Sequence, residues 1–343
     1  MFLSLNRVML SIEQIKSLDL EISSFCVASC PLCPRNFFGM EHNAGYPVTN
    51  ITMDDFKKVF PASFVAQLDY VKFNGNFGDF NMNPHAQDIL LYLRQQSSKI
   101  KLEIHTNGSA RNSKFWSALA ESDPVIYFDL DGLEDTHCLY RVGTSFEKIL
   151  KNAGAFIAAG GRAVWKMIVF EHNKHQIEEC RHRADKLGFK NFRIVNDGRD
   201  HAVVFDHKGK FTHVIGKPSH PTSAHAEELM KWKKEYYNNP IKYPNAPKNK
   251  IECLAKKNTS IYMASNGDIY PCCWLGFHPR TYDEELHLGN SQLKSLMKDS
   301  KNNAIKYGLE TAMVWFNLVE ESWKKNTFES GKLYRCDMYC GKN

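Results

Sequence analysis

The chain has 343 residues, of which 43% are apolar and 24% are charged, and its formal net charge is +6. These values are typical of a globular protein and exclude a collagen-like, coiled-coil or largely disordered chain. The basic residues are interspersed with acidic ones and form no concentrated stripe, which argues against a nucleic-acid partner. The N-terminal residues lack the apolar run of a signal peptide, and no window approaches the ~20 apolar residues that span a bilayer, so we expect a cytoplasmic protein without membrane contact.

Apolar, strand-like runs alternate with segments of helical periodicity from residue 18 to residue 196. About six repeats of this alternation predict an α/β fold with a parallel sheet and right-handed crossovers, either doubly wound or curled into a barrel. In both arrangements the functional groups belong at the carboxyl ends of the strands. The predicted strands cover residues 18–23, 70–74, 101–106, 125–130, 163–170 and 192–196.

The alternation ends near residue 197, and the rest of the chain is predicted to be organised differently. A stretch rich in Pro and Lys follows, which indicates a linker or irregular insertion with one helix near 224–237. Alternating apolar residues then predict a hairpin that turns at Asn266-Gly267, and residues 291–330 predict two helices. We therefore expect three parts: a first domain at 1–200, a linker or insertion at 201–250, and a smaller α+β domain at 251–343.

Three cysteines, Cys26, Cys30 and Cys33, have the spacing C-x3-C-x2-C and follow the first predicted strand. Three thiolates on one tight loop can bind three irons of a [4Fe-4S] cluster and leave the fourth iron open to an exogenous ligand. A zinc site is the alternative. Structural zinc favours paired C-x2-C knuckles with a fourth ligand at matching range, and the nearby histidine, His42, lies well beyond the loop, so the spacing favours the cluster.

The segment SSFCVASCPLCPRN resembles the cluster loop of the radical S-adenosylmethionine (radical SAM) superfamily. The resemblance extends over about residues 18–196, through FNGNFGDFNMNP, IHTNG and FDLDG, each of which follows a predicted strand. It implies a partial (βα)6, TIM-like barrel that serves as the radical SAM core. The sequence departs from the family at Leu32, where an aromatic residue is usual, and at Phe77-Gly78-Asp79-Phe80, where the family has Gly-Gly-Glu-Pro.

This resemblance implies that a reduced [4Fe-4S] cluster binds S-adenosylmethionine and cleaves it to a 5′-deoxyadenosyl radical, which abstracts hydrogen from a substrate. The SAM contacts that it implies lie at the ends of the second, third and fourth predicted strands. In the loop after the second strand, Gly78 and Asp79 would meet the methionyl ammonium group. The side chain of Asp79 is one methylene shorter than that of the usual glutamate. Asn107 would add a polar contact, and Asp129 would bind the ribose hydroxyls.

Two cations, Arg141 and Lys166, are further candidates, because either could pair with the carboxylate of S-adenosylmethionine. Each of these polar residues also has a structural alternative. Asp129 and Asp131 could cap the turn at Gly132. Arg141 could be a surface cation, and Lys166 could extend its charged end out of a half-exposed strand.

Four more cysteines form a second group near the end of the sequence: Cys253, Cys272, Cys336 and Cys340. The predicted hairpin brings Cys253 and Cys272 together, and the chain end can return the other two. Four thiolates suit either an auxiliary [4Fe-4S] cluster or a tetrahedral zinc ion. The segment resembles the SPASM/twitch extension of radical SAM enzymes, and its cysteine number fits the twitch form with one auxiliary cluster.

Three cysteines are left outside the two predicted ligand sets. Adjacent strand residues point to opposite faces, so Cys273 is interpreted as a packed or alternative thiol beside the ligand Cys272. Cys180 lies in helical register with apolar residues and is predicted to be buried, and we expect the same of the isolated Cys138.

The sequence therefore predicts a radical SAM oxidoreductase or modifying enzyme that acts on a peptide or protein side chain. Its auxiliary cluster would take part in electron transfer, with a structural role as the alternative. A flavodoxin- or ferredoxin-like protein would supply electrons. A small alcohol-bearing metabolite is the alternative substrate, and a zinc-binding structural or nucleic-acid module is the alternative of another class.

Overall fold

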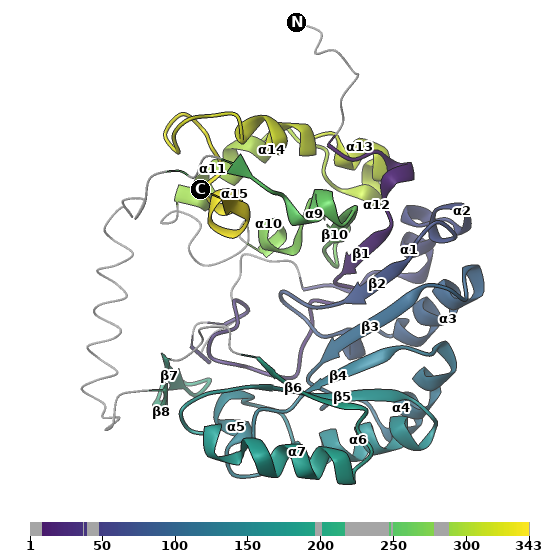
Figure 1. Ribbon diagram of the computed structural model, residues 1–343, viewed down its shortest axis with the longest axis vertical. Coiled ribbons are helices and arrows are strands. Elements are labelled where there is room, and N and C mark those ends of the chain that lie inside the picture. The colour runs from purple at the N-terminus through teal and green to yellow at the C-terminus, as the bar shows by residue number, and fades with distance from the viewer. Residues whose placement is uncertain are drawn as a thin grey trace, which may run out of the picture.

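One sheet runs through the whole molecule and curves into an open, partial barrel (Figure 1). Its strand order is β11-β10-β1-β2-β3-β4-β5-β6, and β1 to β6 pair in parallel with their neighbours. These six strands are Ser17–Leu20, Tyr70–Phe73, Lys101–Thr106, Val125–Asp129, Arg162–Ile168 and Asn191–Val195. The computed structural model describes residues 9–36, 38–39, 48–195, 201–216, 247, 250–277 and 288–342. The predicted α/β partial barrel is thus confirmed.

Helices connect the parallel strands and cover the outer face of the sheet (Figure 1). Several begin where a side chain caps the first turn: Thr52 accepts from Asp55 N before α1, and Asn112 accepts from Phe115 N before α4. These helices are α1 Met53–Val59, α2 Ala62–Val65, α3 Ala86–Gln96, α4 Ser113–Leu119, α5 His137–Tyr140, α6 Phe146–Ala158 and α7 Ile177–Lys186. Short 3-10 turns are η1 Ile12–Gln14, η2 Phe80–Met82, η3 Ala120–Ser122 and η4 Lys174–Gln176.

The two faces of the sheet differ in polarity, and this difference positions the site. Along β3 the residues Leu102, Ile104 and Thr106 are buried, whereas Glu103 and His105 between them are only half-buried. The same alternation along β1 and β2 buries one set of apolar side chains beneath the helices. The opposite, inner face of the barrel therefore carries polar and charged side chains.

The C-terminal hairpin extends the barrel sheet. β10, Ser260–Met263, pairs in parallel with β1, and β11, Ile269–Tyr270, runs antiparallel to β10. The turn occurs at Asn266-Gly267 as predicted, and Gly267 has φ +86°, a conformation that favours glycine. The apolar core is continuous from the first strands through this hairpin. The division at 200 and 250 thus stays a prediction, but the last part of the chain packs as one body with the barrel.

Short helices and one small sheet complete the C-terminal part. They are β9 Lys250–Ile251, α9 Leu254–Lys257, α10 Cys273–Phe277, α11 Leu288–Met297, α12 Ala304–Tyr307, α13 Leu309–Met313, α14 Phe316–Ser322, α15 Tyr334–Cys340 and β12 Gly341–Lys342, with β12 antiparallel to β9. The prediction of two helices over 291–330 is wrong. Asn303 caps the short α12, and Gly308, at φ +80°, separates it from α13.

A hairpin also forms where the sequence predicted a linker. β7, His201–Phe205, and β8, Phe211–Gly216, pair antiparallel, and Val204 and Ile215 pack against Ala28 and Cys30. The prediction of an irregular segment is therefore wrong for residues 201–216. The helix predicted near 224–237 lies outside the described residues.

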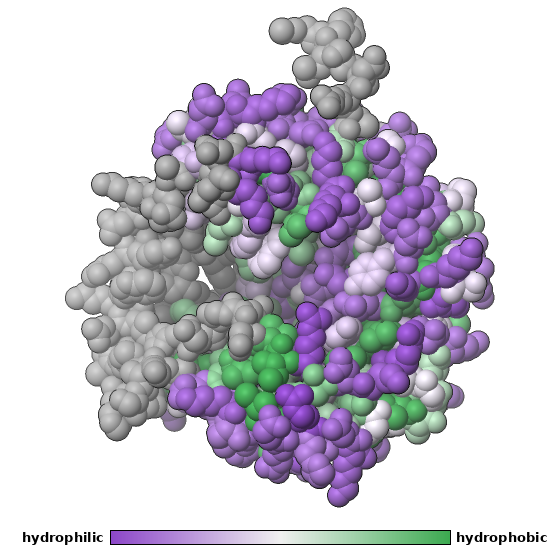
Figure 2. All heavy atoms as spheres, in the orientation of Figure 1, coloured by the Kyte–Doolittle hydropathy of each residue, from purple (hydrophilic) through white to green (hydrophobic). Residues whose placement is uncertain are grey.

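The described surface is mainly polar on the side that Figure 2 shows, with apolar residues gathered where β6 lies in Figure 1. Ile194 of β6 is one of the exposed large apolar residues. Within the described parts of the chain, no helix is both long enough and apolar enough to cross a membrane.

Candidate active site

The loop after β1 carries Cys26, Cys30 and Cys33, and backbone hydrogen bonds fix its shape. Cys33 N donates to Cys30 O at 2.9 Å, and Ser29 N donates to Val142 O at 2.8 Å. The guanidinium of Arg35 donates to Cys26 O and to Ala28 O, at 3.4 and 3.1 Å. The loop therefore turns tightly, and the structure places the three predicted thiols together at the carboxyl end of the barrel.

The thiols of this loop are desolvated, yet cations lie beside them. Burial raises the pKa of Cys26, and it raises the pKa of Cys30 to about 11. The guanidinium of Arg141 opposes the second shift and favours the thiolate of Cys30. Arg35 likewise favours the thiolate of Cys26. Thiolate ligands need such positive surroundings or a bound metal to lose their protons.

The arrangement fits a cluster better than a single ion. Among the described residues, no three His, Cys, Asp or Glu side chains converge closely enough to hold one metal ion. A tetrahedral zinc site requires such convergence, whereas a cubane cluster takes one thiolate per iron and so needs its cysteines spread around it. The donor chemistry, three soft thiolates on one loop, therefore suits an iron-sulfur cluster.

The loop after β2 approaches the cysteine loop closely. A Cβ on Gly78 would lie 1.9 Å from Ser23 O, so a larger residue cannot occupy this position. Asp79 N donates to Phe25 O at 2.8 Å, which joins the two loops. Both predicted residues, Gly78 and Asp79, thus lie against the cysteine loop.

Glu21 supports this contact, and the sequence analysis did not single it out. One of its carboxylate oxygens accepts from Phe77 N and Gly78 N, both at 2.7 Å, and the other accepts from Tyr262 OH at 2.6 Å. Glu21 is 2% exposed, so these bonds take the place of water. A second acidic residue in the predicted strand at 18–23, two positions after Asp19, was the available signal for it.

Asp79 and Asn107 form one hydrogen-bonded unit beside Cys26. Asp79 is 6% exposed, and burial raises its pKa although several donors oppose the shift. Asn107 donates to Asp79 from its backbone N at 2.7 Å and from Nδ2 at 2.6 Å, and Nδ2 also lies 3.3 Å from Cys26 Sγ. The structure therefore brings these two predicted residues together with the first cysteine.

The other predicted polar residues form a buried ion-pair network. Lys166 Nζ lies 2.6 Å from Asp129 Oδ1, and Arg141 lies 3.3 Å from Asp129 and 2.6 Å from Asp131. Burial opposes the charge of Asp129, but Lys166 and Arg141 hold its pKa below the usual value. Neither cation is a surface residue, so the structural alternatives considered for Arg141 and Lys166 do not apply. Asp131, which is fully buried, was considered only as a turn cap.

The network continues down the inner face of the barrel through residues that the sequence analysis did not name. Lys166 Nζ lies 3.0 Å from His105 Nδ1, and His105 Nε2 lies 2.8 Å from Glu103. The ammonium group of Lys166 can only donate, so His105 accepts at Nδ1 and donates from Nε2 to Glu103. His105 also stacks on Tyr127, with ring centroids 4.6 Å apart.

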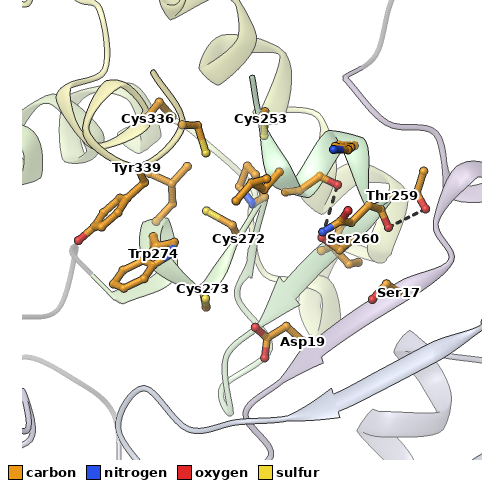
Figure 3. Close-up of a pocket in the computed structure, with 18 of the residues that line it drawn as sticks. Ser17, Asp19, Cys253, Thr259, Ser260, Cys272, Cys273, Trp274, Cys336 and Tyr339 are labelled. Atoms are coloured by element: carbon orange, nitrogen blue, oxygen red, sulfur yellow. Dashed lines mark hydrogen bonds between the residues drawn. The ribbon is translucent and has the colours of Figure 1, made fainter. Parts of the chain in front are cut away.

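The second cysteine group lines a cavity of about 830 Å³ between β1, β2 and the C-terminal helices (Figure 3). Antiparallel pairing of β12 with β9 brings Cys340 beside Cys253, because Glu252 N donates to Cys340 O at 2.9 Å. Burial raises the pKa of Cys253 and Cys272, and it raises the pKa of Cys336 to about 12. The four predicted thiols, Cys253, Cys272, Cys336 and Cys340, thus come from distant parts of the sequence to one cavity.

Cys272 and Cys273 point in different directions. In Figure 3 the sulfur of Cys272 faces Cys336, whereas that of Cys273 is directed toward Asp19. The carboxylate of Asp19 pairs with Lys72 Nζ at 3.0 Å. Burial raises the pKa of Cys273 to about 12, and the charge of Asp19 acts in the same direction. This arrangement supports the distinction drawn between the two cysteines.

The two remaining cysteines differ in burial. Cys180 is fully buried in α7, as predicted. The expectation for Cys138 is wrong, because this thiol is exposed. α5 is only four residues long. Its buried face carries His137 and Tyr140, so Cys138 between them faces outward.

Comparisons with known proteins agree with this fold. The Radical SAM superfamily model matches residues 20–184. SuiB of Streptococcus suis bound to S-adenosylmethionine aligns with a TM-score of 0.53 and 15% identity, covering 94% of this chain and 70% of that one.

SuiB bound to the precursor peptide SuiA gives a TM-score of 0.52 and 18% identity over 88% of this chain and 64% of that one. Native anSMEcpe with bound AdoMet gives a TM-score of 0.48 and 17% identity, covering 93% of this chain and 89% of that one. No curated protein sequence matches the chain. The matched segment begins at the end of β1, ends in α7 and includes the cysteine loop, so this part of the chain is similar to the radical SAM superfamily domain.

Proposed function

We propose that this chain is a radical SAM enzyme that abstracts hydrogen from a peptide or protein side chain. The observation that carries the proposal is the position of Cys26, Cys30 and Cys33 on one hydrogen-bonded loop at the carboxyl end of the barrel, within the segment that matches the family. When bound there, a [4Fe-4S] cluster and S-adenosylmethionine would supply the electron and the 5′-deoxyadenosyl radical for this chemistry.

The residues around the loop would orient S-adenosylmethionine. Arg141 and Lys166 are held by Asp129 and Asp131, and both retain N–H groups that can donate to a carboxylate. Asp129 would meet ribose hydroxyls on the same edge. Because these groups are already fixed by each other, little ordering entropy would be lost when the cosubstrate binds.

The hairpin β7–β8 would exclude water from this site. Val204 and Ile215 pack with Ala28, Cys30 and Tyr140 in a second apolar cluster. A radical that removes hydrogen from unactivated C–H bonds also reacts with stray donors, so an enclosed site protects the intended reaction.

We propose that Cys253, Cys272, Cys336 and Cys340 hold an auxiliary [4Fe-4S] cluster in a twitch-like C-terminal part. Five cysteines line this cavity, and the sulfur of Cys273 is directed toward Asp19, which leaves these four as the candidate ligands (Figure 3). Four protein ligands leave no iron free, which favours electron transfer over substrate binding at this cluster. A flavodoxin- or ferredoxin-like protein would be the electron donor to the enzyme.

The fold shared with SuiB, which has been solved with a precursor peptide, supports a peptide substrate. A small alcohol-bearing metabolite remains the alternative substrate class.

The experiment is an anaerobic incubation of the reconstituted protein with dithionite and S-adenosylmethionine, with 5′-deoxyadenosine measured by chromatography. We expect formation of 5′-deoxyadenosine that rises when the correct substrate class is added. Peptide pools and alcohol-bearing metabolites would be compared as separate additions. A chain that binds iron but releases no 5′-deoxyadenosine under any of these conditions would overturn the proposal.

A further inference from the structure

Asn107, in the loop after β3, has a side-chain amide whose orientation is set by its partners. Its Oδ1 accepts from Ser109 N at 2.9 Å, and its Nδ2 donates to Asp79 Oδ2 at 2.6 Å and lies 3.3 Å from Cys26 Sγ. The oxygen faces a donor and the nitrogen faces a carboxylate, so the reversed orientation would lose both bonds. One amide N–H is therefore directed at the sulfur of Cys26.

The carboxylate of Asp79 holds this amide and is itself saturated. Oδ2 accepts from Asn107 N at 2.7 Å as well as from Nδ2, and Oδ1 accepts from the Thr106 hydroxyl at 2.7 Å and from Asn81 N at 3.2 Å. An ionised carboxylate offers about four lone-pair sites. All four are used, so an incoming ammonium group would have to displace one of these donors.

We propose that Asn107 raises the reduction potential of the metal cluster at Cys26, and that Asp79 is the positioning residue that holds Asn107 for this task. A hydrogen bond donated to a ligand sulfur stabilises the more negatively charged, reduced state of a cluster. The inference rests on the proposed function, because it requires a cluster at Cys26. It assigns Asp79 a role other than binding the methionyl ammonium group.

The test is a redox titration of the reconstituted chain, followed by electron paramagnetic resonance (EPR) without substrate or S-adenosylmethionine. Parallel samples with S-adenosylmethionine identify the signal of the first cluster. Asn107→Leu keeps the size of the side chain and removes the N–H donor. We expect its midpoint potential to shift to a more negative value while iron content stays at the wild-type level. If the leucine variant folds poorly, Asn107→Ala replaces it, because alanine also lacks the N–H donor. We expect its midpoint potential to shift to a more negative value as well.

Asp79→Asn tests the positioning role. Removing the carboxylate charge beside Cys26 by itself raises the potential, whereas releasing Asn107 lowers it. Asp79→Asn should therefore shift the potential less positively in the wild-type background than in the Asn107→Leu background, where only the charge effect remains, because Asp79 acts through Asn107. Ser109→Ala is the matched control: its hydroxyl accepts from Ser145 N and touches neither Asp79 nor Cys26, so its potential should equal that of the wild type.

The outcomes separate this inference from the proposed function. A wild-type potential in iron-replete Asn107→Leu or Asn107→Ala would refute the role of Asn107. An Asp79→Asn shift of equal size in the two backgrounds, together with weaker S-adenosylmethionine binding, would show that Asp79 binds the cosubstrate, which refutes the positioning role. A wild-type chain that binds no cluster would refute the proposed function itself.

Discussion

The two cysteine groups are built in different ways. The first lies on a single loop. Arg35 belongs to this loop and donates to its backbone carbonyls, and Arg141 is held by Asp131 at the same edge of the barrel. The second is assembled from β-strand ends and helices that lie far apart in the sequence, and its thiols are strongly desolvated in a cavity. The comparison teaches that the cysteines of the first site are brought together by local sequence spacing, whereas those of the second are brought together by the tertiary fold.

The largest expected effect comes from removing the first group. The triple variant Cys26→Ala/Cys30→Ala/Cys33→Ala should lower iron from about eight to about four per chain and reduce 5′-deoxyadenosine formation to the level without enzyme, because no open iron remains. Iron analysis and chromatography measure both quantities. Retention of 5′-deoxyadenosine formation would show that the reactive cluster is bound elsewhere.

Removing the second group should also lower the iron content but should leave the response of the first cluster to S-adenosylmethionine intact. Cys253→Ala combined with Cys272→Ala should lower iron to about four per chain while the first cluster keeps its EPR response to S-adenosylmethionine. Cys273→Ala is the matched control and should keep about eight irons, since its thiol faces Asp19. Equal iron loss in Cys273→Ala and Cys272→Ala would contradict the assignment of ligands.

The cations of the first site should contribute to stability. Arg141→Met leaves the buried carboxylates of Asp129 and Asp131 without one partner, and we expect the free energy of unfolding to fall by about 3–5 kcal/mol. Arg162→Met removes an exposed ion pair with Asp123 and should cost at most about 1 kcal/mol. Urea titration of both variants tests the contrast, and equal losses would argue against a buried network.

The smallest effect concerns pH at the first site. His137 is buried, its Nδ1 accepts from Asp131 N, and burial lowers its pKa to about 3. At pH 5 the unfolded chain has taken up a proton at this residue and the folded chain has not, so stability falls as the pH drops below the ordinary histidine value near 6.5.

The wild type should therefore lose about 2 kcal/mol more than His137→Asn between pH 7 and pH 5. Asparagine keeps an acceptor for Asp131 N but does not titrate. Urea titrations of the two proteins at both pH values provide the measurement. Parallel losses in the two proteins would mean that His137 is protonated in the folded state.

Local patterns in the sequence were sufficient for most of the barrel. The predicted strand at 101–106 has the observed bounds, because Leu102, Ile104 and Thr106 alternate with polar residues. The cysteine loop and the loops that carry Asp79, Asn107 and Asp129 were placed correctly at strand ends, since parallel strands align their carboxyl ends.

Long-range contacts were the part that the sequence did not reveal. The pairing of β10 with β1 joins Ser260 to Ser17, and nothing in either strand marks the other as its partner. Glu21, Asp131 and His105 acquire their roles only from side chains that distant segments bring to them. The hairpin at 201–216 was missed because its polar turn and short strands resemble a linker.

The central claim is tested most directly by the EPR spectrum of the reduced, reconstituted wild-type chain before and after addition of S-adenosylmethionine. If Cys26, Cys30 and Cys33 hold a cluster with one open iron, the signal that is lost in their triple alanine variant should change its g-values when S-adenosylmethionine is added. A spectrum that S-adenosylmethionine leaves unchanged, in a chain with its full iron content, would contradict the account.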